Sequence, residues 1–261
     1  MTLIPRLLRP RPASLRTPVP KVITFWSPVS AGSTTLAAAL AAALARHGSR
    51  VALLDYDLWT PSLPRVTSSL DAAASHVLHG TLDPARFAAA LQRVNPPGVH
   101  LLAGADDPLR AEALSREHYQ QLIAATAALH DAVIIDAGRM LSLAASLTAV
   151  DAADLLVVPV LPHPNAARHV ARYLNLLESE LRVDLAHMRL ILNHVSPHPQ
   201  LDRATITGIL RHRIDLEVPH RREWGLGPGL EWPAPLSPDH VAALLHPPTQ
   251  LTVPEAAHAS D

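Results

Sequence analysis

Seven short apolar runs, alternating with longer stretches rich in Ala and Leu, occupy the chain from residue 21 onward. Short aliphatic runs of this kind are typical of strands buried on both faces, and their alternation with helices is the pattern of a parallel α/β sheet. We therefore predict one doubly wound α/β domain with a seven-stranded, mainly parallel sheet. The predicted strands are Val22–Ser27, Arg50–Asp57, Val99–Ala103, Ala132–Asp136, Leu155–Leu161, Arg189–His194 and Ile214–Val218.

The stretches between these runs are predicted to be helices. Two of them carry clear end signals, because Gly48 follows the first as a carboxyl-terminal stop and Asp83-Pro84 opens the third as an N-cap with proline in the first turn. The predicted helices are Thr34–His47, Leu70–His79, Pro84–Val94, Glu112–Leu129, Asn165–Leu181 and Arg203–Arg211, with a shorter one at Asp239–Leu244.

The two ends of the chain differ in charge. Residues 1–20 contain five prolines, and all their charged groups are basic, whereas residues 223–261 carry five acidic groups and no Lys or Arg. Proline-rich segments with few apolar residues have little to pack into a core. We therefore predict a basic, proline-rich leader at 1–20, the α/β domain at 21–224 and a proline-rich, acidic tail at 225–261.

Composition excludes several kinds of chemistry. The 261 residues include no cysteine, which rules out disulfides, thiolate zinc sites, cysteine-ligated iron–sulfur clusters and thiol catalysis. No stretch approaches the ~20 apolar residues that cross a bilayer, and the start lacks the apolar segment of a signal peptide, so we expect a cytoplasmic protein. Lys21 is the only lysine. A mechanism that needs a second lysine is therefore unavailable.

A candidate phosphate-binding loop lies between the first predicted strand and the Ala-rich helix. In the general pattern Gly-x-x-x-x-Gly-Lys-[Ser/Thr], backbone amides surround phosphate, the lysine reaches the outer phosphates and the hydroxyl holds Mg²⁺. Here Ser27 stands at the first glycine position, Gly32 at the second, Ser33 at the lysine and Thr34 at the hydroxyl. Half of the pattern is retained, and a strand-to-helix turn with a Ser/Thr cap is the alternative interpretation.

Three aspartates strengthen the nucleotide interpretation. Asp55 and Asp57 come at the end of the second predicted strand, and their spacing of two predicts that both side chains point to one side. Asp136 ends another predicted strand. Carboxyl ends of parallel strands border the ligand crevice, and an aspartate there holds Mg²⁺ beside a triphosphate. We predict that Thr34 and Asp136 bind this Mg²⁺, although each carboxylate alone would be typical of a turn.

With these residues the chain, from Lys21 to about Trp224, resembles the MinD/ParA family of deviant Walker A P-loop ATPases. The family's loop reads Lys-Gly-Gly-x-Gly-Lys-Thr-Thr and aligns from Pro28 onward. Gly32, Thr34 and Thr35 match it, whereas Pro28 and Ser33 replace its two lysines. The family's first lysine reaches the partner's nucleotide across a dimer, and the second holds the outer phosphates. Neither replacement can do this.

The resemblance extends to the other site residues. Asp57 falls on the aspartate that positions the attacking water, Asp136 on the Walker B position and Asn193 on the residue that reads adenine. The resemblance implies a site for ATP or ADP with Mg²⁺, with Asp55 and Asp57 catalytic if the protein is active. The residues expected to bind the nucleotide are Gly32, Ser33, Thr34, Thr35 and Asn193.

The missing lysines decide between two functions. Losing a preorganised cation raises the barrier of such a reaction by roughly 3–4 kcal/mol, so we expect weak nucleotide binding with negligible hydrolysis. The resemblance then implies a degenerate positioning or scaffold protein, similar to the TadZ/CpaE-like factors that mark sites of pilus assembly. The alternative is an active ATPase of DNA partitioning or of division or appendage placement, in which Arg139 replaces the lysine. A metallochaperone ATPase is disfavoured because cysteine is absent.

The expected partners also follow from the resemblance. It implies a homodimer and an unidentified protein partner. The basic cluster at 211–213 and 220–222 suggests weak contact with DNA without sequence preference, with local pairing to helix ends and carboxylates as the alternative. No basic residue follows Arg222, so we expect no basic membrane-anchoring helix. Trp59 would mark an interface if exposed and the core if buried.

Overall fold

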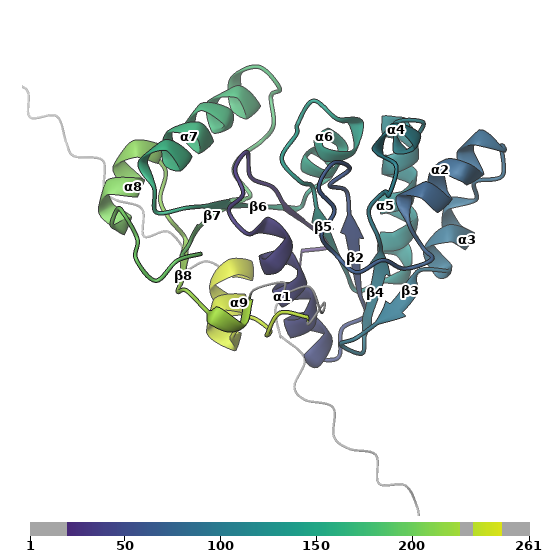
Figure 1. Cartoon of the computed structure of the whole chain (residues 1–261), viewed down its shortest axis with the longest axis horizontal. Helices are drawn as coiled ribbons and strands as arrows, with labels where there is room; N and C mark the ends of the chain where they lie inside the picture. Colours follow the sequence, from purple (N-terminus) through teal and green to yellow (C-terminus); the bar gives the residue numbers. More distant parts are fainter. Residues whose placement is uncertain (1–19, 225–231, 247–261) are drawn as a thin grey trace, which may run out of the picture.

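The computed structural model describes residues 20–224 and 232–246 (Figure 1). Nearly all of the predicted leader and most of the predicted tail, residues 1–19, 225–231 and 247–261, lie outside the described residues. Within the described ranges the strands form one eight-stranded sheet in the order β3-β4-β2-β5-β1-β6-β7-β8. The strands are β1 (Val22–Phe25), β2 (Val51–Asp55), β3 (Gln92–Val94), β4 (Val99–Leu102), β5 (Ala132–Asp136), β6 (Leu155–Val160), β7 (Met188–Asn193) and β8 (Leu216–Val218).

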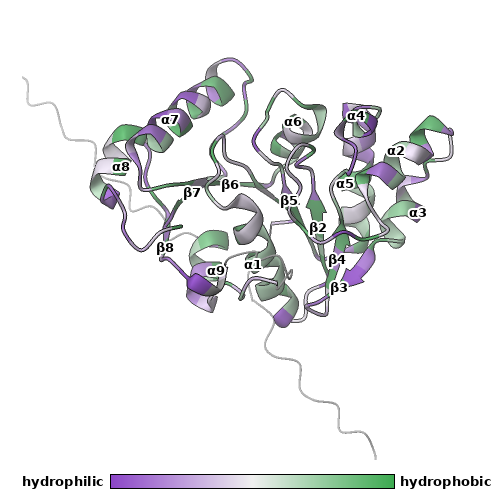
Figure 2. Ribbon diagram, viewed as in Figure 1, coloured by the Kyte–Doolittle hydropathy of each residue, from purple (hydrophilic) through white to green (hydrophobic). Residues whose placement is uncertain are grey.

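The doubly wound, mainly parallel sheet is confirmed, and the predicted strand count is one short. Every neighbouring pair is parallel except β3 and β4, which are antiparallel. The predicted helix Pro84–Val94 is wrong beyond Ala89, because Gln92–Val94 pairs with β4 instead. β3 lies at the edge of the sheet and is hydrophilic (Figure 2), so it lacks the apolar pattern that identified the other strands.

Helices cover both faces of the sheet. α1 (Ser33–Arg46) and α9 (Pro238–Leu245) pack on one face and contribute to one apolar cluster. Residues of the remaining helices belong to a second cluster on the other face, or pack against it. These helices are α2 (Leu70–Leu78), α3 (Pro84–Ala89), α4 (Pro108–Ala111), α5 (Arg116–Leu129), α6 (Ala144–Asp151), α7 (Pro164–Ser179) and α8 (Arg203–Leu210).

α1 is central to the packing. Its residues from Leu36 to Ala45 are all buried, which small alanine side chains permit because they allow the helix to approach the strands and α9 closely. Two groups of the 232–246 segment bond to carbonyls of α1: Trp232 Nε1 donates to Ala38 O at 3.1 Å and the Leu236 amide donates to Ala39 O at 3.2 Å. This segment therefore packs on α1.

The sheet places the ends of its central strands next to one another. Asp55 at the end of β2 is paired in register with Asp136 at the end of β5, and Phe25 at the end of β1 is paired with Asp136 on the other side. The loop from β1 to α1 leaves the sheet at this edge. None of the helices in the described ranges is both long and apolar enough to span a membrane.

Candidate functional site

The loop between β1 and α1 is held in shape by a glycine and by a buried amide. Gly32 adopts the left-handed conformation, with φ 84° and ψ 26°, directly before α1. Asn193 Nδ2, at the end of β7, donates to Ala31 O at 2.8 Å, and a Cβ on Gly32 would lie 2.7 Å from the same Nδ2. Both backbone angle and available space therefore require glycine here. Ser27 donates from Oγ to Pro159 O at 2.8 Å and fixes the loop's start to β6.

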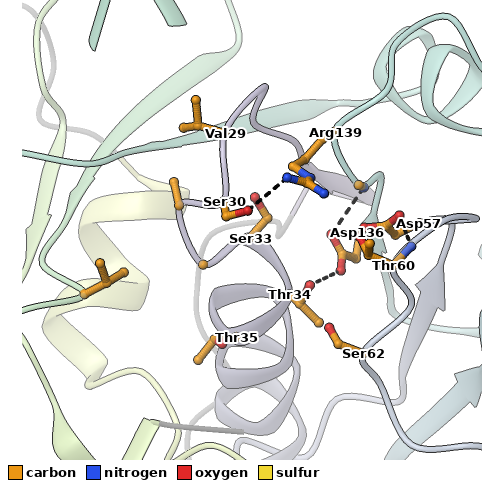
Figure 3. A pocket seen from close by; sticks show the side chains of 14 residues that line it. Val29, Ser30, Ser33, Thr34, Thr35, Asp57, Thr60, Ser62, Asp136 and Arg139 are labelled. Carbon is orange, nitrogen blue, oxygen red and sulfur yellow. Dashed lines mark hydrogen bonds between the residues drawn. The ribbon is translucent and has the colours of Figure 1, made fainter. Parts of the chain in front are cut away.

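The loop borders a cavity of about 350 Å³ at the amino-terminal end of α1 (Figure 3). Of the described residues that line it, Arg139 alone carries a positive side chain. Arg139 follows β5, and its Nη1 donates to Ser30 Oγ in the loop at 3.1 Å. The lining residues are Val29, Ser30, Ala31, Gly32, Ser33, Thr34, Thr35, Asp57, Thr60, Ser62, Asp136, Gly138, Arg139 and Val195.

Thr34 and Asp136 meet at the inner wall of this cavity. Thr34 Oγ1 donates to Asp136 Oδ2, and the Gly138 amide donates to Asp136 Oδ1 at 3.4 Å. Asp136 is 1% exposed, and burial raises the pKa of its carboxyl to about 6, with the negative charge of Asp57 acting in the same direction. A hydroxyl beside a carboxylate is a ligand set that suits Mg²⁺, which prefers oxygen. The two predicted metal ligands are thus together in the structure.

Asp55 and Asp57 occupy different environments. β2 ends at Asp55, two residues earlier than predicted, so Asp57 lies in the following loop and lines the cavity. Its Oδ1 accepts from the amides of Trp59 at 3.2 Å and Thr60 at 3.0 Å, and its Oδ2 accepts from Thr60 Oγ1 at 2.7 Å. Asp57 is therefore held in a turn with its carboxylate at the cavity wall.

Asp55 does not line the cavity and is fully buried. Its Oδ1 accepts from the Asp57 amide at 3.1 Å, whereas its Oδ2 has no hydrogen-bond partner among the described residues. Burial raises the pKa of the Asp55 carboxyl well above its ordinary value, and the nearby charge of Asp136 adds to this shift. The two strand-end carboxylates are therefore not equivalent: Asp57 faces the cavity and Asp55 does not line it.

A second cavity, of about 300 Å³, adjoins the first around the start of α1. The two cavities share Gly32, Thr35 and Val195. Asn193 and His194, at the end of β7, line one side of the second cavity. Residues that follow β8 line the rest of it. The residues contributed after β8 are Pro219, His220, Arg221, Arg222 and Trp224.

The basic residues at 211–213 and those at 220–222, which the sequence analysis treated as one cluster, lie in different places in the structure. Arg211 follows α8 as its C-cap, and Arg213 pairs with Asp215 at 2.8 Å, whereas His220, Arg221 and Arg222 line the second cavity. Sequence reasoning did not connect these last three residues with the loop. The only signal was their position directly after a predicted strand, at the edge where ligand sites form.

Trp59 and Lys21 are not among the described residues that line the two cavities. Trp59 is 47% exposed, which favours the interface interpretation over the core. Lys21 lies at the opposite end of β1 from the loop, where its Nζ donates to His130 O. The only lysine of the chain therefore does not reach the cavity.

A strand, a loop with a left-handed glycine, a helix that begins with hydroxyl residues and an aspartate at the end of the adjacent strand define a P-loop NTPase fold. A family model described as an AAA domain matches residues 29–186. No curated protein sequence matches the chain. Together with the solved structures described next, the family model shows that this chain belongs to the MinD/ParA family of ATPases.

Three solved structures illustrate the similarity. A ParA family ATPase from Chlorobium tepidum is 19% identical, with a TM-score of 0.68 over 77% of this chain and 85% of that one. The septum site-determining protein MinD from Pyrococcus horikoshii, complexed with Mg-ADP, is 18% identical, with a TM-score of 0.62 over 77% and 82%. A putative plasmid partition protein from Borrelia burgdorferi, bound to AMPPNP, is 18% identical, with a TM-score of 0.61 over 85% and 94%.

Proposed function

We propose that this chain is a positioning or scaffold protein of its family that binds ATP or ADP with Mg²⁺ weakly and hydrolyses ATP negligibly. The observation that supports this proposal is the composition of the loop cavity. It keeps the glycine, the helix start and the Thr34–Asp136 pair, yet Ser33 stands where the family has its phosphate-binding lysine. A site of this kind retains contacts to phosphate but lacks the cation at the transferring group.

In the proposed complex, the backbone amides from Gly32 to Thr35 bind the phosphates, since an amino-terminal helix end attracts anions. Thr34 and Asp136 hold Mg²⁺, which when bound neutralises charge on the outer phosphate oxygens. Asn193 donates its Nδ2 to Ala31 O, so its Oδ1 remains as the acceptor for the base. Asp57 is the carboxylate placed to orient water, with Asp55 supporting its turn through the Asp57 amide.

The size of the expected rate loss follows from electrostatics. Removing one preorganised group that stabilises the transition state costs on the order of 3–4 kcal/mol, or about two to three decades in rate. Binding loses less, because amides and Mg²⁺ still neutralise the phosphates. The proposal is therefore a protein controlled by nucleotide occupancy rather than by rapid turnover.

The positioning role is proposed from the names of two similar proteins, a septum site-determining protein and a putative plasmid partition protein. We propose a cytoplasmic homodimer with a further protein partner, comparable to TadZ-like factors of pilus assembly. Trp59 supports this, since it is exposed directly beside the cavity residue Asp57 and exposed tryptophans are enriched in interfaces. Weak, sequence-independent contact with DNA through exposed Arg211 and Arg213 is a secondary part of the proposal.

The second candidate is a working ATPase. Arg139 supports it, because its guanidinium lines the phosphate cavity and donates to Ser30 of the loop. An arginine delivered from the loop after β5 would replace the missing lysine charge. This candidate differs from the first in one measurable property, which is steady phosphate release.

Calorimetric titration with Mg-ADP and Mg-ATP, run beside a phosphate-release assay, separates the candidates. We expect binding heat with both nucleotides and negligible release. Absence of heat with either nucleotide would contradict the proposal. Steady release that Arg139→Gln and Asp57→Ala both abolish would establish the second candidate. Arg168→Gln is the matched control, because Arg168 is exposed on α7 and bonds to Asn165.

A further inference from the structure

The second cavity, around the start of α1, is lined by more positively charged side chains than the cavity that the loop borders. Arg221 and Arg222 line it together with His220, whereas Arg139 alone supplies positive charge to the phosphate cavity. No Asp or Glu is among the described residues that line the second cavity. Phosphates bound at the loop therefore do not account for the positive charge of the second cavity.

The two arginines are available to a ligand. Among the side chains that the structure describes, which do not include that of Glu223, neither arginine forms an ion pair, and the Glu217 carboxylate of β8 lies 2.7 Å from His194 Nε2. The Arg221 guanidinium lies 5.1 Å from the centre of the Trp224 ring. Packing over a ring holds a guanidinium in place and leaves the N–H groups of its edge free to donate.

The two cavities adjoin at Gly32 and Thr35, which line both of them. Each holds about 300–350 Å³. Together they lie within the range of small-molecule sites, roughly 300–1,000 Å³. A nucleotide with its 5′-phosphates at the loop would therefore place its nucleoside portion in the second cavity.

We propose that the preferred ligand carries a second phosphate, attached to the ribose, and that Arg221 and Arg222 bind this group. The inference rests on the proposed nucleotide site and specifies its ligand class: an adenine nucleotide phosphorylated at the 2′ or 3′ position as well as at the 5′ position. Arginine suits this task, because its planar donor edge bonds phosphate oxygens in pairs.

The test compares ligands that differ only in the ribose phosphate. AMP, adenosine 3′,5′-bisphosphate and adenosine 2′,5′-bisphosphate are titrated into the full chain by calorimetry, with ADP in parallel. We expect one bisphosphate to bind about 10- to 100-fold more tightly than AMP, the gain given by one or two charge-assisted hydrogen bonds. The preferred isomer shows whether the 2′ or the 3′ position faces the arginines.

Variants assign the gain to these side chains. The ratio of the AMP and bisphosphate Kd values should fall towards one in Arg221→Gln and Arg222→Gln and should stay at the wild-type value in Arg168→Gln. Arg168 is exposed on α7 and does not line the second cavity. Because Arg221 also packs on Trp224, Arg222→Gln keeps the test valid if Arg221→Gln fails to fold.

Each result is decisive. ADP binding with no gain for either bisphosphate overturns this inference and leaves the proposed function standing. A gain that survives both arginine substitutions overturns the assignment to Arg221 and Arg222. No binding of any of the four nucleotides overturns this inference and the proposed function together.

Discussion

Buried polar groups at the two ends of the central strands differ in how completely they are hydrogen-bonded. At the carboxyl ends, Asp55 and Asp136 are buried side by side, burial raises both pKa values, and Asp55 Oδ2 has no partner in the described residues. At the amino ends, both ring nitrogens of buried His130 are bonded, Nδ1 to Thr126 O and Nε2 to His100 Nδ1, each at 2.9 Å.

This difference separates a region that stabilises the fold from the region of the proposed nucleotide site. Burial lowers the pKa values of His130 and His100, so both remain neutral and bonded to each other at the amino end. At the other end, the raised pKa values of Asp55 and Asp136 mean that ionisation of either buried carboxyl costs stability. Unfavourable burial of this kind is common at functional sites.

The largest effect is expected from the loop glycine. Gly32→Val adds left-handed strain and a clash with Asn193, which together cost about 3–4 kcal/mol in the free energy of unfolding. Mg-ADP binding should be lost as well. Gly48→Val is the control, since Gly48 has φ 89° but no atom within 4 Å of the point where a Cβ would lie, so it carries backbone strain alone, about 1–2 kcal/mol. Equal losses in denaturant titrations would contradict the role of Asn193.

The second prediction concerns Asp136→Asn in Mg²⁺-free buffer without nucleotide. The folded pKa of about 6 lies above the reference of 3.8, so ionisation of Asp136 costs stability as pH rises from about 4 to 6, and the cost persists above that range. The substitution should therefore raise the free energy of unfolding at pH 7.5 by on the order of 2–3 kcal/mol. The gain should vanish near pH 4. If Asp136→Asn is less stable than the wild type at pH 7.5, the ionised Asp136 carboxylate does not cost stability.

The third prediction tests the amino end. The pKa values of His130 and His100 are lowered from 6.5, so the unfolded chain binds more protons and stability falls as pH decreases below 6.5. We therefore expect the free energy of unfolding to decrease between pH 7 and 5.5. Denaturation should be followed in the Asp136→Asn background, because Asp136 changes stability in the opposite direction. His100→Phe should make the free energy of unfolding less dependent on pH in this range. An unchanged pH dependence would contradict the role of the histidine pair.

The smallest effect on stability is expected at Trp59. Trp59→Ala should change the free energy of unfolding by less than about 0.5 kcal/mol, because the side chain is 47% exposed. It should nonetheless weaken self-association, measured by sedimentation with Mg-ADP present. Leu109→Ala, at another exposed apolar residue, is the control. Identical sedimentation of the wild type and Trp59→Ala would contradict the interface role.

The central architecture could be predicted from the sequence because buried parallel strands have a strong local signal. Val51–Asp55 and Ala132–Asp136 are continuous apolar runs that end in aspartate, and the loop with Gly32 lies between a strand and a helix. β3 escaped prediction because it is a three-residue, hydrophilic edge strand whose identity depends on pairing with β4.

Other features depend on tertiary contacts that no local pattern contains. α6 begins after Leu143 without a side-chain cap, so the usual start signal is missing. The different environments of Asp55 and Asp57 depend on where β2 ends, and a shift of two residues separates a buried group from a cavity wall. The entry of Arg221 and Arg222 into the cavity beside the loop depends on how β8 pairs with β7.

Nucleotide binding without hydrolysis is examined by two assays on the same preparation of the wild-type chain: calorimetry with Mg-ADP and phosphate release from saturating Mg-ATP. A loop that keeps its shape but has no lysine should give measurable binding heat for Mg-ADP and release at least a hundredfold slower than a lysine-containing relative assayed beside it, which is the lower end of the roughly two to three decades expected. Release as fast as that of the relative, abolished by Asp57→Ala, would contradict the account.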